Sequence, residues 1–159
     1  AGLPPRPVTD VIAIANTGNV DIMWNEPNIY DVQISGYNVY VAHASAKPTD
    51  ISQFNLLTTI QTTTYTYTTD SPSNCYVLIT PISTTGIENT DISYITPVIT
   101  APTFSSASWF VIDMLEKKDK LSTYFSVGDI KTITIGGKSQ QIAIYGFKHD
   151  DLSDGYYRF

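Results

Sequence analysis

The segments that decide the fold are VDIMW (residues 20–24), GYNVYV (residues 36–41) and CYVLIT (residues 75–80). In the first of them apolar side chains alternate with others up to Trp24, the period of two that is typical of a half-buried strand. Similar runs lie before and after these segments in the chain, and each is bounded by Gly, Pro, Asn, Asp or Ser. This regular spacing predicts an all-β fold rather than a helical one.

Seven such runs lie between residues 8 and 100, the number that an antiparallel immunoglobulin-like sandwich requires. The expected strands are Val8–Ala15, Val20–Trp24, Ile34–Ala42, Phe54–Ile60, Thr62–Thr68, Tyr76–Ile82 and Ser93–Thr100. The Pro-rich residues 1–7 are expected to form an extended lead-in segment, because Pro fixes φ and disfavours helix in the preceding residue.

A different pattern begins after Ala101. Residues 101–107 are expected to be a linker, and residues 108–159 a small α+β appendage made of one helix and one hairpin. Ser106 or Ser108 is the expected N-cap of the helix. Gly136-Gly137 is the two-residue turn of the hairpin, between Thr132–Ile135 and Gln141–Phe147.

The bulk composition excludes several classes of function. The chain has 159 residues and a net charge of −6, and its few basic residues are scattered, which argues against a nucleic-acid partner. No apolar stretch approaches the roughly 20 residues that a membrane-spanning helix needs, so we expect no membrane insertion. No Ser/His/Asp arrangement, metal-ligand spacing or nucleotide loop indicates an enzyme, and neither catalytic residues nor cofactors are predicted.

Residues 4–100 resemble a fibronectin type III domain. The resemblance rests on the Pro-rich start, on Trp24 after Val20 and Ile22, and on the GYNVY and YVLI segments (residues 36–40 and 76–79) followed by Gly86. It implies that Trp24 packs in the core between the two sheets. Such domains are usually spacers or binding modules, so the fold alone indicates little about chemistry.

Residues 108–155 resemble a second module, which recurs in tail-associated and surface proteins of bacterial viruses and prophages. The segments that carry this resemblance are Ser108-Trp109, YFSVGDIKTI (residues 124–133), Gly136-Gly137 and GFKHDDLSDG (residues 146–155). It implies a non-enzymatic structural or interaction protein on the tail, baseplate or capsid surface of a virion. Its partners would be other virion proteins, copies of itself, or a glycan or protein on the host surface.

Two aromatic groups are candidate contact residues. A helix with a lone hairpin is only marginally stable in water. The aromatic side chains of the appendage are therefore expected to pack against the sandwich, another copy of the chain or a partner subunit. These candidate interface residues are Trp109, Phe110, Tyr124, Phe125 and Phe147. Tyrosines bring a large contact area at low entropic cost, and the candidate binding residues are Tyr65, Tyr67, Tyr156 and Tyr157.

Two polar features have simpler interpretations. His149, Asp150, Asp151 and Asp154 lack the spacing of a calcium loop, and a solvated turn is the expected structure there. Cys75 cannot form a disulfide within the chain and is expected to be a buried, inert thiol, because both histidines fall in other segments. No metal site is therefore predicted.

A second function remains open from the sequence. The chain is also compatible with an accessory binding or spacer module of a secreted bacterial carbohydrate-active enzyme or adhesin. The expected location is the virion surface in the first case, and the extracellular space or the bacterial cell surface in the second.

Overall fold

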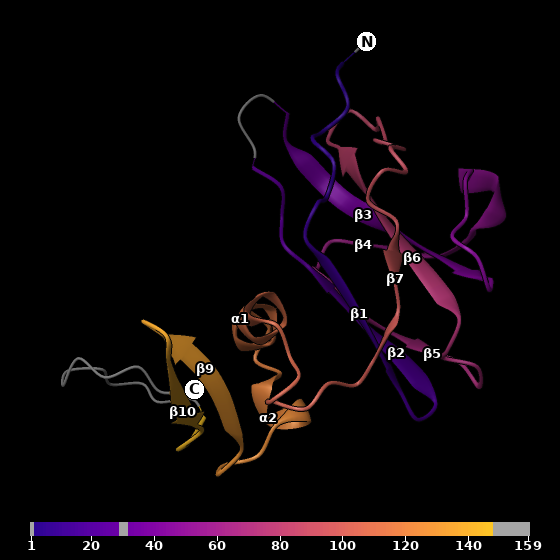
Figure 1. Cartoon of the computed structure of the whole chain (residues 1–159). Helices are drawn as coiled ribbons and strands as arrows, with labels where there is room; N and C mark the ends of the chain where they lie inside the picture. The colour runs from indigo at the N-terminus through magenta and orange to yellow at the C-terminus, as the bar shows by residue number, and fades with distance from the viewer. Residues whose placement is uncertain (1, 29–31, 148–159) are drawn as a thin grey trace. The chain divides into compact units, whose positions relative to one another are not determined.

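The computed structural model describes residues 2–28 and 32–147, and the chain divides into two compact units, residues 1–100 and 101–159. Figure 1 shows the two units, the first built of strands and the second of two helices and a hairpin. Each unit is described by itself below.

Unit 1 is a sandwich of two four-stranded sheets. One sheet has the order β5-β2-β1-β8 and the other the order β4-β3-β6-β7 (Figure 1). Neighbouring strands are antiparallel, except that β1 and β8 pair in parallel. The strands are β1 (Val11–Asn16), β2 (Asn19–Trp24), β3 (Ile34–His43), β4 (Asn55–Ile60), β5 (Thr64–Thr68), β6 (Cys75–Ser83), β7 (Thr96–Pro97) and β8 (Ile99–Thr100). This arrangement confirms the predicted mainly-β sandwich.

The core between the sheets is centred on Trp24, as the resemblance of residues 4–100 implied. Trp24 is fully buried, and its ring meets the edge of Tyr37 from β3 at a centroid distance of 5.5 Å. Alternate residues of the facing strands complete this cluster, among them Val20, Val39 and Val77. The inner faces of the two sheets therefore share an apolar layer. The prediction that β2 is half-buried is wrong, because Asp21 and Met23 on its other face are buried as well.

The last predicted strand is wrong in its length. Ser93–Thr100 is not one strand but two short ones, and β7 and β8 belong to different sheets. β7 pairs with β6 and ends at Pro97. The N–H of Val98 donates to the carbonyl oxygen of Cys75 at 2.9 Å, and the chain then joins the edge of β1.

The outer face of the β3–β6 sheet is covered by loops. A short 3-10 helix, η1 (Ile51–Gln53), precedes β4, and Asp50 and Gln53 form a reciprocal capping box at its start. Phe54 caps this helix rather than starting the strand, and it packs with Leu78 and Ile95 on the outer face. The sequence analysis did not predict this helix, although Asp50 and Gln53 carry the spacing of a capping box.

Unit 2 contains α1 (Trp109–Lys117), α2 (Leu121–Tyr124) and a hairpin of β9 (Ile130–Ile135) and β10 (Lys138–Ala143). Ser108 is the N-cap of α1, and its hydroxyl accepts from the N–H of Val111, which decides between the two predicted caps. The short helix α2 was not predicted.

The hairpin turn is the predicted one, but the return strand begins three residues earlier than expected. Gly136 and Gly137 both have positive φ, 57° and 77°, as a two-residue primed turn requires. Such a turn pairs Ile135 directly with Lys138, so β10 runs over Lys138–Ala143 instead of Gln141–Phe147.

Candidate functional site

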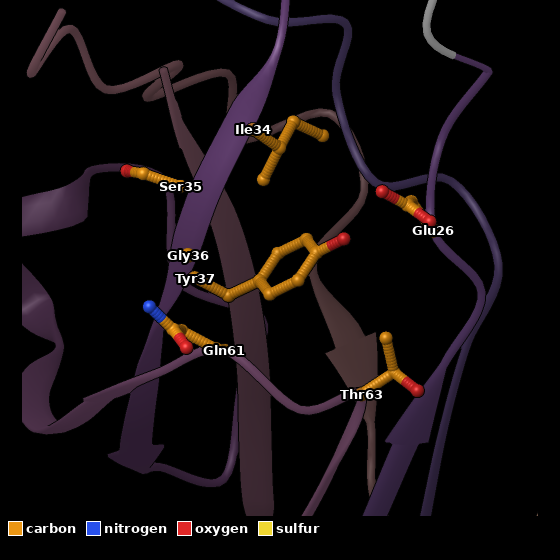
Figure 2. A pocket seen from close by; sticks show the side chains of 7 residues that line it. All are labelled: Glu26, Ile34, Ser35, Gly36, Tyr37, Gln61 and Thr63. Carbon is orange, nitrogen blue, oxygen red and sulfur yellow. The ribbon is translucent and has the colours of Figure 1, made fainter. Parts of the chain in front are cut away.

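A pocket of about 410 Å³ lies at one end of the sandwich, in unit 1. Glu26 follows β2 in one sheet, Ile34 and Tyr37 lie on β3 in the other, and Gln61 and Thr63 belong to the connection between β4 and β5. Figure 2 shows the Tyr37 ring extending from β3 across this space with its hydroxyl toward Glu26. The described residues of the pocket therefore offer one carboxylate, one phenol, one amide and the hydroxyl of Thr63 beside the aliphatic side chain of Ile34. The sequence analysis missed this group, because its members come from three separate segments.

The wall of the pocket formed by β3 is fixed by its own contacts. Ser35 also borders the pocket, but its side chain points to the other side of the strand, and its hydroxyl donates to the carbonyl oxygens of Ile82 and Ser83 (Figure 2). A Cβ on Gly36 would lie 3.0 Å from the carbonyl oxygen of Ile60. Glycine at this position thus lets the end of β4 lie close against β3.

Two effects raise the pKa of Tyr37 to about 12. Burial of the phenol is the larger cause, and the negative charge of Glu26 adds to it. The hydroxyl of Tyr37 is therefore protonated at neutral pH and can donate a hydrogen bond into the pocket.

A second polar group, on the outer face of the same sheet, is a network centred on Glu88. One carboxylate oxygen, Oε1, accepts from the Asn38 side chain at 2.9 Å, from the Tyr40 hydroxyl at 2.7 Å and from the Thr80 hydroxyl. Thr59 in turn donates to the amide oxygen of Asn38. The network ties β3, β4 and β6 to the loop that carries Glu88, and its donors are occupied, so its role is structural.

We expect this network to make unit 1 sensitive to acid. Burial raises the pKa of Glu88, but the hydrogen bonds from Thr80, Asn38 and Tyr40 together outweigh it, and the net direction is downward. A depressed folded-state pKa stabilises the fold above the unfolded value of about 4.3, and this contribution is lost as the pH falls through the folded-state pKa. Glu88→Gln should lower the free energy of unfolding of unit 1 at pH 7 and flatten its decline in acid.

Urea unfolding at neutral and acidic pH, followed by backbone amide signals of β3 and β6, measures this effect. Glu116→Gln is the matched control, because Glu116 is an exposed carboxylate on α1 of the other unit. An equal pH dependence in wild type and Glu88→Gln would contradict the proposed role of the network.

Cys75 is buried as predicted, but the reason given for its inertness is wrong. The pairing of β3 with β6 sets His43 opposite Cys75, and the thiol lies 3.2 Å from Nδ1 of His43. The other ring nitrogen of His43 lies 3.0 Å from the hydroxyl of Tyr67. The thiol is only 2 % exposed, and burial raises its pKa, so the group is a poor nucleophile despite its histidine neighbour.

The predicted binding tyrosines of β5 lie against the core. Tyr65 and Tyr67 are partly buried and pack on the cluster around Trp24, while Thr66 and Thr68 are exposed on the other face of the strand. Tyr156 and Tyr157 lie outside the described residues, as do His149, Asp150, Asp151 and Asp154. Ligand binding by these tyrosines stays a prediction.

The predicted interface aromatics of unit 2 differ in their exposure. Phe125 is buried, and its ring packs on Phe104 at a centroid distance of 5.4 Å, so it belongs to the core of its own unit. Trp109 and Phe110, at the start of α1, are 45 % and 47 % exposed. Tyr124 and Phe147 are intermediate. Other exposed apolar side chains of this unit are Val127, Ile130, Ile135 and Tyr145.

Lys131 holds the segment before α1 in place. Its ammonium donates to the carbonyl oxygens of Ala107 at 2.5 Å, Ser105 at 3.2 Å and Phe104 at 3.4 Å. It also lies 5.5 Å from the centroid of the Trp109 ring. The side chain is 9 % exposed, so this is a buried cation satisfied by carbonyl oxygens rather than by an anion.

Two features are absent from the part of the chain that the structure describes. Within residues 2–28 and 32–147, no three His, Cys, Asp or Glu side chains are grouped so that they could hold a metal ion. In the same part of the chain, no helix has the length and apolar character that crossing a membrane requires.

Comparisons with known proteins were made for the whole chain. No family model matches it, and no curated protein matches it. A solved Fn3-like protein from Clostridium thermocellum is similar at 17% identity and a TM-score of 0.46, over 63% of this chain and 97% of that one. A human fourth FNIII domain is similar at 17% identity and a TM-score of 0.45, over 64% of this chain and 88% of that one.

A third solved structure is the sixth fibronectin type III domain of human fibronectin type III domain containing protein 3. It is 12% identical, with a TM-score of 0.43, over 68% of this chain and 97% of that one. These neighbours carry the fold name that the resemblance of residues 4–100 predicted. The assignment of unit 1 as a sandwich rests on its strand order, and the resemblance of residues 108–155 stays a prediction.

Proposed function

We propose that this chain is a non-enzymatic structural and interaction protein of a bacteriophage virion. It would lie on the tail, the baseplate or the capsid surface, and would attach subunits or hold the particle to a host surface. The sandwich supports a role as a stable module, since folds of this kind are commonly spacers or binding domains. The resemblance of residues 108–155 to modules of tail and surface proteins supports the location.

The observation that carries the proposal is the apolar surface of unit 2. A small unit of two helices and a hairpin exposes Trp109, Phe110, Ile135 and Tyr145 to between 45 % and 83 %. Aromatic side chains of this size are the usual anchors of protein–protein contacts. Attachment to a virion protein through α1 would bury Phe110 and repeat the contact in every copy, so that weak single contacts add up.

Binding of the purified chain to virions from its native source tests this proposal. We expect Phe110→Ser to lower the fraction that pellets with the particles, with an affinity about tenfold weaker, because a central aromatic anchor is lost. Glu116→Ser is the matched control, since it puts the same residue on an exposed position of the same helix. It should bind like the wild type.

Three outcomes contradict the proposal. The wild-type chain does not pellet with virions, or both variants bind equally well, or the chain binds bacterial cell walls and not particles. The last outcome would favour the accessory module of a secreted enzyme or adhesin.

A further inference from the structure

We propose that the pocket of unit 1 binds one neutral sugar unit of a glycan. This inference rests on the proposed function, because it names the chemistry of the host surface that the particle would hold. The site consists of Glu26, Ile34, Tyr37, Gln61 and Thr63, none of which was a candidate from the sequence. Its volume of about 410 Å³ falls within the range of about 300–1,000 Å³ that small-molecule sites occupy.

The polar groups of the pocket match a ligand that is rich in hydroxyls. The Glu26 carboxylate only accepts hydrogen bonds, while the Gln61 amide and the Tyr37 hydroxyl both donate and accept. Among the residues that the structure describes, neither Glu26 nor Gln61 has a hydrogen-bond partner for its side chain. A sugar hydroxyl can donate to the first group and accept from the second.

The charge of the pocket selects against anions. Among the described residues that border it, Glu26 is the one ionised side chain, and none is Lys, Arg or His. Its charge is felt inside the pocket, because it contributes to the raised pKa of Tyr37. A phosphate, a sulfated sugar or a sialic acid would be repelled there, whereas a neutral ring would gain a charge-assisted hydrogen bond.

The apolar part of the pocket is small. Ile34, half-buried on β3, is the one aliphatic side chain among its described lining residues, and Tyr37 is only 2 % exposed, so its ring offers no open face to a sugar. Tyr37 is held in place by its edge contact with Trp24, so binding does not have to order this side chain. Glu26 and Gln61 are exposed, so the site is shallow and a millimolar dissociation constant is expected for a single sugar. Many copies on a particle would convert this into useful avidity.

Chemical-shift titration of the full chain tests the proposal. The probes are methyl glucoside, methyl galactoside, methyl mannoside and N-acetylglucosamine, with n-butylamine and inorganic phosphate as comparison ligands. We expect at least one sugar to shift the backbone amides of residues 26, 36, 61 and 63 with saturation, and phosphate to leave them unchanged. Glu26→Gln should weaken this binding about tenfold, because the charge-assisted bonds are lost.

Two further variants separate binding from folding. Tyr37→Phe keeps the ring that packs on Trp24 and removes only the hydroxyl, so it should weaken binding without unfolding unit 1. Glu116→Gln changes an exposed carboxylate outside the pocket and should bind like the wild type.

The proposal is overturned if no sugar shifts the pocket amides, if n-butylamine shifts them and the sugars do not, or if Glu26→Gln binds sugar unchanged. A chain that pellets with virions but fails this titration would refute the sugar site and leave the virion role standing.

Discussion

Trp24→Ala should unfold most of unit 1 at temperatures where the wild-type chain is folded. The indole is fully buried between the sheets and packs on the edge of Tyr37, so truncation leaves a large cavity in the centre of the core. Replacements of this kind cost about 3–5 kcal/mol, a large part of the 5–15 kcal/mol that stabilises a typical domain. For a unit of this size the melting temperature should fall by about 20 °C.

Thermal unfolding followed by the methyl signals of Val20 and Val39 measures the effect on this core. Leu56→Ala is the matched control, because Leu56 lies on β4 of the same unit and is 54 % exposed. Trp24→Phe should cost less than Trp24→Ala, since it keeps an aromatic ring and removes an indole N–H that has no partner among the described residues. A melting temperature of Trp24→Ala equal to that of Leu56→Ala would contradict the placement of Trp24 at the centre of the sandwich.

Lys131→Met should selectively unfold unit 2. The change keeps the apolar stem of the side chain and removes the ammonium group. That group donates hydrogen bonds to the carbonyl oxygens of Phe104, Ser105 and Ala107. Hydrogen bonds to a charged group contribute about 1.5–3 kcal/mol, and the carbonyl oxygens would also remain buried without a donor. A unit as small as residues 101–159 has little stability to lose.

Amide hydrogen exchange distinguishes the two units in this experiment. Protection in α1, β9 and β10 should be lost, while β3 and β6 of unit 1 stay protected. Lys138→Met is the control, because Lys138 lies exposed at the start of β10. Retained protection of α1 in Lys131→Met would show that this buried cation does not hold the unit together.

The strands that alternate clearly were predictable from sequence, and the exceptions have local causes. β2, β3 and β6 were placed to within a residue at each end, because their apolar and aromatic runs are bounded by turn residues. Ser93–Thr100 failed because the chain changes sheets within this run, between β7 and β8. η1 was not predicted, because a helix of three residues has no apolar period to detect.

The polar sites were not predictable, since each assembles residues that are distant in sequence. His43 meets Cys75 through the register of β3 and β6, which no local pattern specifies. Glu88 lies about fifty residues from Asn38 and reaches it only because the loop folds over the outer face of the sheet. The alternation in β3 and β6 does place the polar side chains of Asn38, Tyr40 and Thr80 on one face of the sheet. It does not indicate that Glu88 lies against them.

The location of Tyr65 and Tyr67 shows a related limit. Thr/Tyr alternation correctly indicated a strand, but it does not say which face carries the contacts. The structure puts the threonines Thr66 and Thr68 in solvent and the tyrosines on the core cluster. Which side chains of such a strand are exposed therefore depends on how the strand packs in the sandwich, and aromatic content alone does not predict it.

The most direct test of the virion role is the composition of native particles. Virions from the native source would be banded on a density gradient, washed at high salt, and analysed for this chain by quantitative mass spectrometry. We expect the chain to band with the particles in a fixed ratio to a known structural protein, before and after the wash. Recovery of the chain only in the soluble or cell-envelope fraction would contradict the proposal.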